Sequence, residues 1–116
     1  MIDYTENLKS ALEECGLPVF HERFITDKPV PCISFIDTQN DDYLLGDTLE
    51  YSAIGYIVKV WSTRISDFYT YGQLIDSKLK PLGFKRTAAS SLFPPEQTIG
   101  QFYMRYEATG RKTIID

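Results

Sequence analysis

The stretch LEYSAIGYIVKVWS, residues 49–62, decides the fold because its alternating pattern is typical of a β-strand. Alternate residues from Ile54 to Val60 are apolar and fall on one face of an extended chain. The opposite face also carries apolar groups, which predicts a central strand covered by a helix on at least one side. Because the stretch is longer than most strands, we expect a bend or bulge near Gly55.

An amphipathic helix is predicted directly after this strand, from Ser66 to the residue before Gly83. Apolar residues recur there at helical spacing: Ile65, Phe68, Gly72, Ile75, Leu79 and Leu82. A glycine inside a helix costs about 1 kcal/mol relative to alanine, so we expect Gly72 to mark a close approach to the sheet. Pro81 and Gly83 then end the helix.

A second, shorter helix is predicted near the N-terminus. Asp3 and Glu6 resemble a capping box. The apolar residues that follow fall on one helical face: Leu8, Ala11, Leu12 and Cys15. Gly16 suits the left-handed residue that ends a helix, and Pro18 prevents its continuation. We expect a strand over residues 19–24 to follow.

The remaining segments predict the rest of one sheet. After two prolines, a strand extends from about Ile33 to Gln39, and residues 40–47 have the composition of a turn-rich loop. Residues 84–93 and 98–109 are expected to form a closing hairpin.

The whole chain, residues 1–116, is therefore interpreted as a single α+β domain. The element order is α-β-β-β-α-β-β, and we expect one single antiparallel sheet with two helices packed on one face. Residues 110–116 are expected to form a loose C-terminal tail.

The composition narrows the function classes. The chain has 116 residues and a formal net charge of −4, and its adjacent basic residues are only Lys85-Arg86 and Arg111-Lys112. Nucleic-acid binding generally requires clustered basic residues, so we expect no specific nucleic-acid binding. No apolar run approaches the roughly 20 residues of a membrane span, and the N-terminus lacks the pattern of a secretion signal. We expect a protein without a membrane partner that is not secreted and assembles in the cytoplasm.

Residues for catalysis or metal binding are scarce. His21 is the only histidine, so a serine or cysteine nucleophile would need it as the general base. A hydrolase would therefore be built on Cys32 and His21, which only tertiary folding could bring together. Cys15, His21 and Cys32 could supply three metal ligands, yet they lack the paired Cys-x-x-Cys spacing of structural zinc sites. We expect no enzymatic activity, no metal and no cofactor, and two buried reduced thiols.

The segment at 40–47 combines carboxylates with apolar residues. It lacks the alternating oxygen ligands of a calcium loop, and its apolar residues must fold back on the core or dock on a neighbour. Loops commonly carry interactions, so we expect contacts here and at the proline-rich loop after residue 92. The candidate interface residues are Asp41, Asp42, Tyr43, Leu44, Leu45, Asp47, Phe93, Pro94 and Pro95.

The order and local character of these elements resemble small tail-completion and tail-terminator proteins of long-tailed bacteriophages and prophages. The likeness covers roughly residues 5–110. It rests on the segments CISFIDTQND, EYSAIGYIVKVWS, ISDFYTYGQLIDSKLKPLGF and FYMRYEATG. It implies a non-catalytic protein of the virion tail that forms an oligomeric ring, commonly a hexamer. The partners it implies are further copies of the chain, the tail tube protein and the head–tail connector proteins.

The net negative charge bears on this expectation. A ring with Asp41, Asp42 and Asp47 facing its lumen would repel DNA, so that DNA passes through without sticking. The alternative is a small-ligand or peptide-binding α+β module of host origin. Its site would be an aromatic-lined cleft between the longer helix and the sheet.

Overall fold

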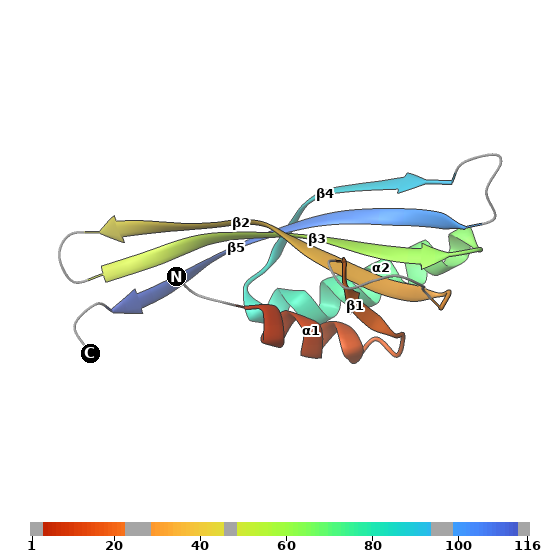
Figure 1. Ribbon diagram of the computed structural model, residues 1–116, viewed down its shortest axis with the longest axis horizontal. Helices are drawn as coiled ribbons and strands as arrows, with labels where there is room; N and C mark the ends of the chain where they lie inside the picture. The colour runs from red at the N-terminus through yellow and green to blue at the C-terminus, as the bar shows by residue number, and fades with distance from the viewer. Residues whose placement is uncertain (1–3, 23–28, 46–48, 94–98, 114–116) are drawn as a thin grey trace.

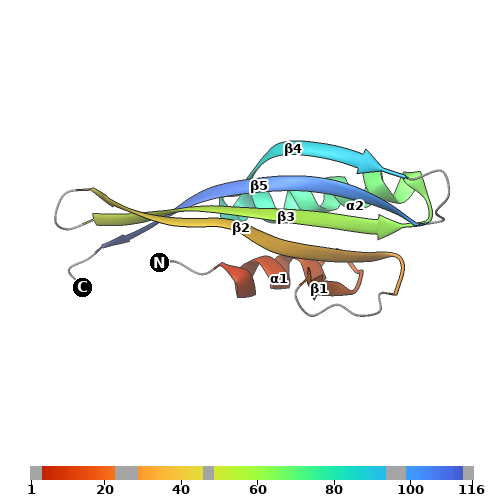
Figure 2. The same ribbon diagram turned by 45° about the horizontal axis from the view of Figure 1, so that its top comes forward.

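A computed structural model describes the backbone of residues 4–22, 29–45, 49–93 and 99–113, and the side chains of 4–22, 29–39, 53–93 and 99–108. The elements in chain order are α1 (Thr5–Glu13), β1 (Val19–His21), β2 (Cys32–Leu45), β3 (Leu49–Ser62), α2 (Ile65–Leu79), the 3-10 turn η2 (Lys80–Leu82), β4 (Lys85–Leu92) and β5 (Gly100–Thr113). The strands form one sheet in the order β1-β2-β3-β5-β4, with both helices on the same face (Figure 1, Figure 2).

The predicted α+β class, element order and placement of the helices are confirmed. The sheet is mixed, however, so the expectation of a purely antiparallel sheet is wrong. β1 runs parallel to β2, with Val19 paired to Ile33. A parallel pair requires the chain to return to the same end of the sheet before the second strand begins, which a tight hairpin turn cannot do.

β2 is longer than the sequence indicates. It pairs with β3 as far as Leu45, so the expected loop is wrong for Asn40–Leu45, and Asp47 lies outside the described residues. Asn and Asp favour turns when considered alone. The long β3 nevertheless offers each of these residues a pairing partner, and strand pairing overrides the local preference.

β5 shows the same effect near the C-terminal end. It continues to Thr113, which is paired with Leu49, although the sequence predicts a loose tail from Gly110 onward. Glycine weakens a strand when considered alone, but Gly110 is paired with Ser52 in the ladder. Residues 114–116 lie outside the described part of the chain.

The bulge expected near Gly55 is present on the neighbouring strand. The register between β2 and β3 shifts between Asp37 and Gln39, which makes Thr38 the extra residue. A Cβ atom added at Gly55 would lie 2.7 Å from the Thr38 hydroxyl oxygen, closer than real Cβ atoms approach. Gly55 therefore leaves room for the bulged chain, which bends the long hairpin at this point.

The core lies between the helices and the inner face of the sheet. Its fully buried side chains come from both helices and from three strands: Leu8, Leu12, Ile33, Phe35, Val58, Val60, Phe68, Ile75, Leu79, Met104 and Tyr106. The close approach predicted at Gly72 is confirmed, because a Cβ atom there would lie 2.9 Å from the Phe102 ring. Phe102 stacks on Phe68 with 5.9 Å between ring centroids. Packed rings thus occupy this part of the helix–sheet interface.

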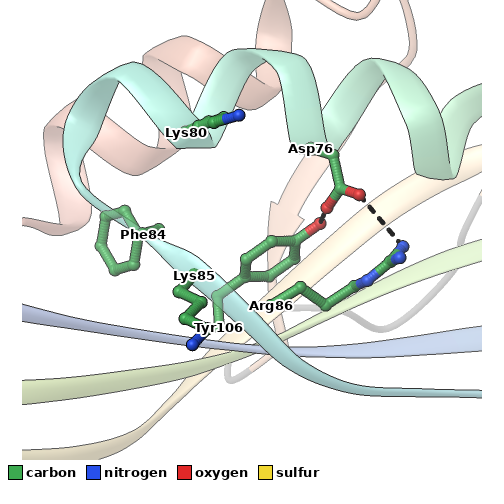
Figure 3. Close-up of a pocket in the computed structure, with 6 residues that line it drawn as sticks. All are labelled: Asp76, Lys80, Phe84, Lys85, Arg86 and Tyr106. Carbon is green, nitrogen blue, oxygen red and sulfur yellow. Dashed lines mark hydrogen bonds and ion pairs between the residues drawn. The ribbon is translucent and has the colours of Figure 1, made fainter.

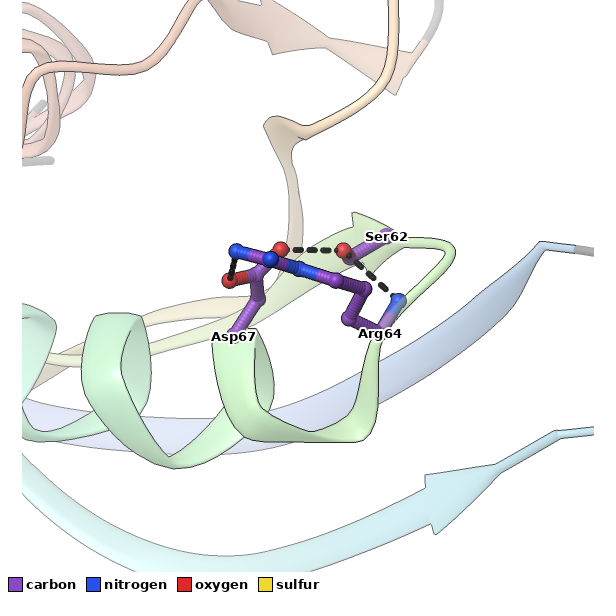
Figure 4. Close-up of polar contacts among 3 residues, drawn as sticks. All are labelled: Ser62, Arg64 and Asp67. Atoms are coloured by element: carbon purple, nitrogen blue, oxygen red, sulfur yellow. Dashed lines mark hydrogen bonds and ion pairs between the residues drawn. The ribbon is translucent and has the colours of Figure 1, made fainter.

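A compact polar cluster fixes the start of α2 to the end of β3 (Figure 4). The buried Ser62 hydroxyl donates to Asp67 Oδ2 at 2.5 Å and accepts the Arg64 backbone N–H at 3.1 Å. Arg64 Nη2 donates to Asp67 Oδ1 at 3.3 Å. Because Asp67 lies in the first turn, its carboxylate also stabilises the helix dipole.

The N-terminal helix ends as predicted but begins differently. Tyr4 is its N-cap residue and makes no side-chain capping hydrogen bond, while Asp3 of the predicted capping box lies outside the described residues. Gly16 has a φ of 90°, which confirms the left-handed residue after the helix.

Candidate functional site

The protein is elongated, with extents of 55 × 25 × 24 Å. Part of this length comes from a three-stranded extension of the sheet, which we call the arm: Asn40–Leu45 of β2, Leu49–Ser52 of β3 and Thr109–Thr113 of β5. The arm projects beyond both helices and beyond β4 (Figure 1). A small sheet without a packed layer gains little stability by itself. The arm is therefore a candidate contact surface.

Exposed apolar side chains gather at the other end of the sheet. There β3 ends and β5 begins, with Ser62 paired to Gly100. The distal patch, as we name it, consists of Ile65 (57% exposed), Tyr69 (66%), Leu92 (48%), Phe93 (36%) and Ile99 (37%). Phe93 also packs against Phe68, with 6.4 Å between ring centroids. Clustered exposed apolar residues are typical of protein contact surfaces.

The sheet face away from the helices carries a polar network among aromatic rings. Lys59 Nζ lies 2.8 Å from Glu22 Oε1 and 5.0 Å from the centre of the Tyr103 ring. Trp61 Nε1 donates to Ser34 Oγ at 2.8 Å, and Ser34 Oγ donates to Glu22 Oε1 at 3.2 Å. These groups satisfy one another across neighbouring strands, so the network stabilises the sheet.

A pocket of about 410 Å³ lies between the C-terminal end of α2 and β4 and is lined by Asp76, Lys80, Phe84, Lys85, Arg86 and Tyr106 (Figure 3). The Tyr106 hydroxyl donates to Asp76 Oδ1, and Arg86 Nη1 lies 3.1 Å from Asp76 Oδ2. Burial raises the pKa of Tyr106 above its ordinary value of 10.0, and the hydrogen bond to Asp76 raises it further. Tyr106 therefore stays protonated at neutral pH, and the three side chains join α2 to the sheet.

The Cys32–His21 pair that a hydrolase would need is not formed. His21 is paired with Phe35 in the ladder, and the two rings pack edge to face at 5.1 Å. Side chains along a strand alternate between the two faces of the sheet. Cys32 lies three residues before Phe35 in β2, so it lies on the other face of the sheet from Phe35. His21 Nε2 lies 3.3 Å from Asp37 Oδ1. Cys15 and Cys32 are buried, as predicted, and burial raises the pKa of the Cys15 thiol.

Within the described ranges, no group of three or more His, Cys, Asp or Glu could hold a metal ion. No helix in the described part of the chain has the length and apolar character needed to cross a membrane. The arm, the distal patch and the pocket are therefore the candidate functional surfaces of the described residues.

The predicted interface residues divide between the two ends of the molecule. The segment Asp41–Leu45 forms an outer strand of the arm, and Phe93 belongs to the distal patch. Asp47, Pro94 and Pro95 lie outside the described residues.

Sequence reasoning missed Ile65 and Tyr69 as surface residues. The predicted apolar stripe of the helix included Ile65 as a buried residue. In the structure Ile65 is the first residue of α2, and both side chains are exposed. An apolar stripe wider than one core-facing side requires is the signal that could have identified them.

Comparison of the sequence with known protein families and with curated proteins gives no match. Comparison of the structure identifies a similar chain in a solved structure described as "Virion of native gene transfer agent (GTA) particle". The match covers 90% of this chain and 84% of that chain, with a TM-score of 0.52 and 11% sequence identity. The two chains therefore share their fold.

Proposed function

We propose that this protein is a non-catalytic structural component of a phage-like virion. The observation that carries the proposal is the fold shared, over most of both chains, with a protein of a gene transfer agent virion. The arm supports it, because neither described helix covers this sheet extension (Figure 1), and such an extension gains stability when another chain packs against it. Catalysis is not part of the proposal, because His21, the only histidine, packs against Phe35, and Cys32 lies on the other face of β2 from Phe35.

Within the virion, the proposed role is that of a tail terminator or tail-to-head joining component in an oligomeric ring. The partners are further copies of the chain, the tail tube protein and head–tail connector proteins. A ring at a junction needs one surface for its own copies and another for the adjoining ring. The arm and the distal patch, at opposite ends of the sheet, supply two such surfaces. A net charge of −4 per subunit favours passage of DNA through the ring without specific binding.

Electron microscopy of particles assembled without this protein tests the role. We expect over-long tails or tails without heads, and normal particles when the wild-type chain is supplied in trans. Tails of normal length joined to heads in the absence of the protein would overturn the proposal.

A double variant, His21→Gln with Cys32→Ala, tests the non-catalytic part. Supplied in trans and shown to fold, it should restore normal particles as well as the wild-type chain does. Failure of the folded variant to restore them would indicate chemistry at these residues.

A further inference from the structure

Two strand edges in the arm have a partner on one side only, within the described residues. β1 pairs with β2 only over Ile33–Phe35, and β4 reaches β5 only as far as Glu107. Among the strands that the structure describes, β3 is the one partner of the Asn40–Leu45 part of β2 and of the Thr109–Thr113 part of β5. β3 lies between them, so they are the two outer strands of the arm (Figure 1). An outer strand presents backbone N–H and C=O groups that can pair with another chain.

These two outer strands carry opposite charge in the sequence. The β2 part contains Asp41 and Asp42, whereas the β5 part contains Arg111 and Lys112. Pairing β2 with β2, or β5 with β5, would place like charges side by side, which is unfavourable across a strand pair. Pairing β2 with β5 places opposite charges together.

We propose that the β2 edge of one subunit pairs with the β5 edge of the next copy, so that the arms join into a continuous sheet. Both strands run antiparallel to β3 and hence in the same direction. Repetition of the subunit around an axis therefore sets β2 of one copy parallel to β5 of its neighbour. Such a head-to-tail contact uses two different surfaces and closes into a ring when the rotation closes. The inference deepens the proposed ring and names the contact that builds it.

Charge exchange on the full chain tests this contact. The first variant, D41K/D42K, makes both outer strands basic, and the second, R111E/K112E, makes both acidic. Each variant alone should associate at least about tenfold more weakly than the wild type in sedimentation velocity over a concentration series. An equimolar mixture should associate again, with both variants alternating in equal amounts, and the quadruple variant should associate alone.

Two controls distinguish loss of this contact from an effect of net charge and from an effect of unfolding. E6K/E13K changes two exposed glutamates on α1, alters net charge as much as D41K/D42K does, and should associate like the wild type. Circular dichroism reports whether each variant folds. D41K/D42K or R111E/K112E alone could unfold the chain. In that case the contact is tested by the quadruple variant, which should recover both folding and association.

Three results would overturn the inference. The first is a wild-type chain that stays monomeric at the highest concentration it reaches. The second is that D41K/D42K and R111E/K112E each associate like the wild type. The third is that their mixture stays dissociated although both variants fold. The proposed virion role is tested by a separate measurement, the electron microscopy of particles that lack the protein. Normal tails in particles lacking the protein, together with the expected exchange pattern, would leave the arm contact standing and remove the virion role.

Discussion

Replacement of Tyr106 by phenylalanine removes one hydroxyl from a buried ring and tests how α2 is held on the sheet. The ring is 1% exposed, and its hydroxyl donates to the Asp76 carboxylate. A hydrogen bond to a charged group contributes about 1.5–3 kcal/mol. Asp76 is 38% exposed, so a water molecule can partly replace the hydrogen bond that its carboxylate loses. We therefore expect Tyr106→Phe to lower the free energy of unfolding by about 1–2 kcal/mol at neutral pH.

The same substitution should change how stability depends on pH. The pKa of Tyr106 is raised in the folded protein, so above pH 10 the unfolded chain loses this proton while the folded chain keeps it. The folded state then binds more protons, and stability falls as pH rises, by at most about 1.4 kcal/mol per pH unit for this single group. The contribution is fully present below pH 10 and is lost above it. Tyr106→Phe should remove this part of the slope.

Urea unfolding followed by the fluorescence of Trp61, the only tryptophan, measures both effects between pH 7 and 11. Tyr103→Phe is the matched control, because it also removes a tyrosine hydroxyl while keeping a ring that contacts Lys59 on the other sheet face. Equal stability of Tyr106→Phe and wild type at pH 7, with the same slope above pH 10, would refute this account of the Asp76 contact.

Further variants test packing at Gly72, the polar cluster at the start of α2 and the distal patch. Gly72→Leu should lower the free energy of unfolding by about 1–3 kcal/mol because the new side chain meets an aromatic ring, whereas Gln73→Leu on the exposed side should change it by less than about 0.5 kcal/mol. Asp67→Ala should cost about 1–2 kcal/mol by leaving a buried serine hydroxyl without its acceptor; an unchanged urea midpoint would count against that cluster. Ile65→Ser with Tyr69→Ser should keep stability within about 0.5 kcal/mol yet reduce co-sedimentation with tail tubes, and undiminished co-sedimentation would exclude the distal patch as the tube contact.

The sequence predicted the elements whose pattern depends on burial. The alternation from Ile54 to Val60 and the helical spacing from Phe68 to Leu79 both reflect one side facing a core, and both are confirmed. Gly72 was informative for the same reason, since a glycine inside a good helix needs a packing explanation.

What the sequence did not predict depends on partners far along the chain. Asn40–Leu45 has the composition of a turn, and only pairing with β3 makes it a strand. The parallel β1–β2 pair depends on the path of a long connection, on which local propensity has no bearing. Segment 110–113 also became strand through pairing with the start of β3. The arm is the main candidate surface. Some of its residues were predicted as interface residues from the sequence, but their pairing into a three-stranded extension was not.

The location of the protein in assembled particles decides whether it works at the junction of tail and head. Quantitative mass spectrometry and gold labelling of purified particles would give its copy number and its position. We expect a small, fixed number of copies at the head-proximal end of the tail. Absence from purified particles, or labelling spread along the whole tail, would contradict it.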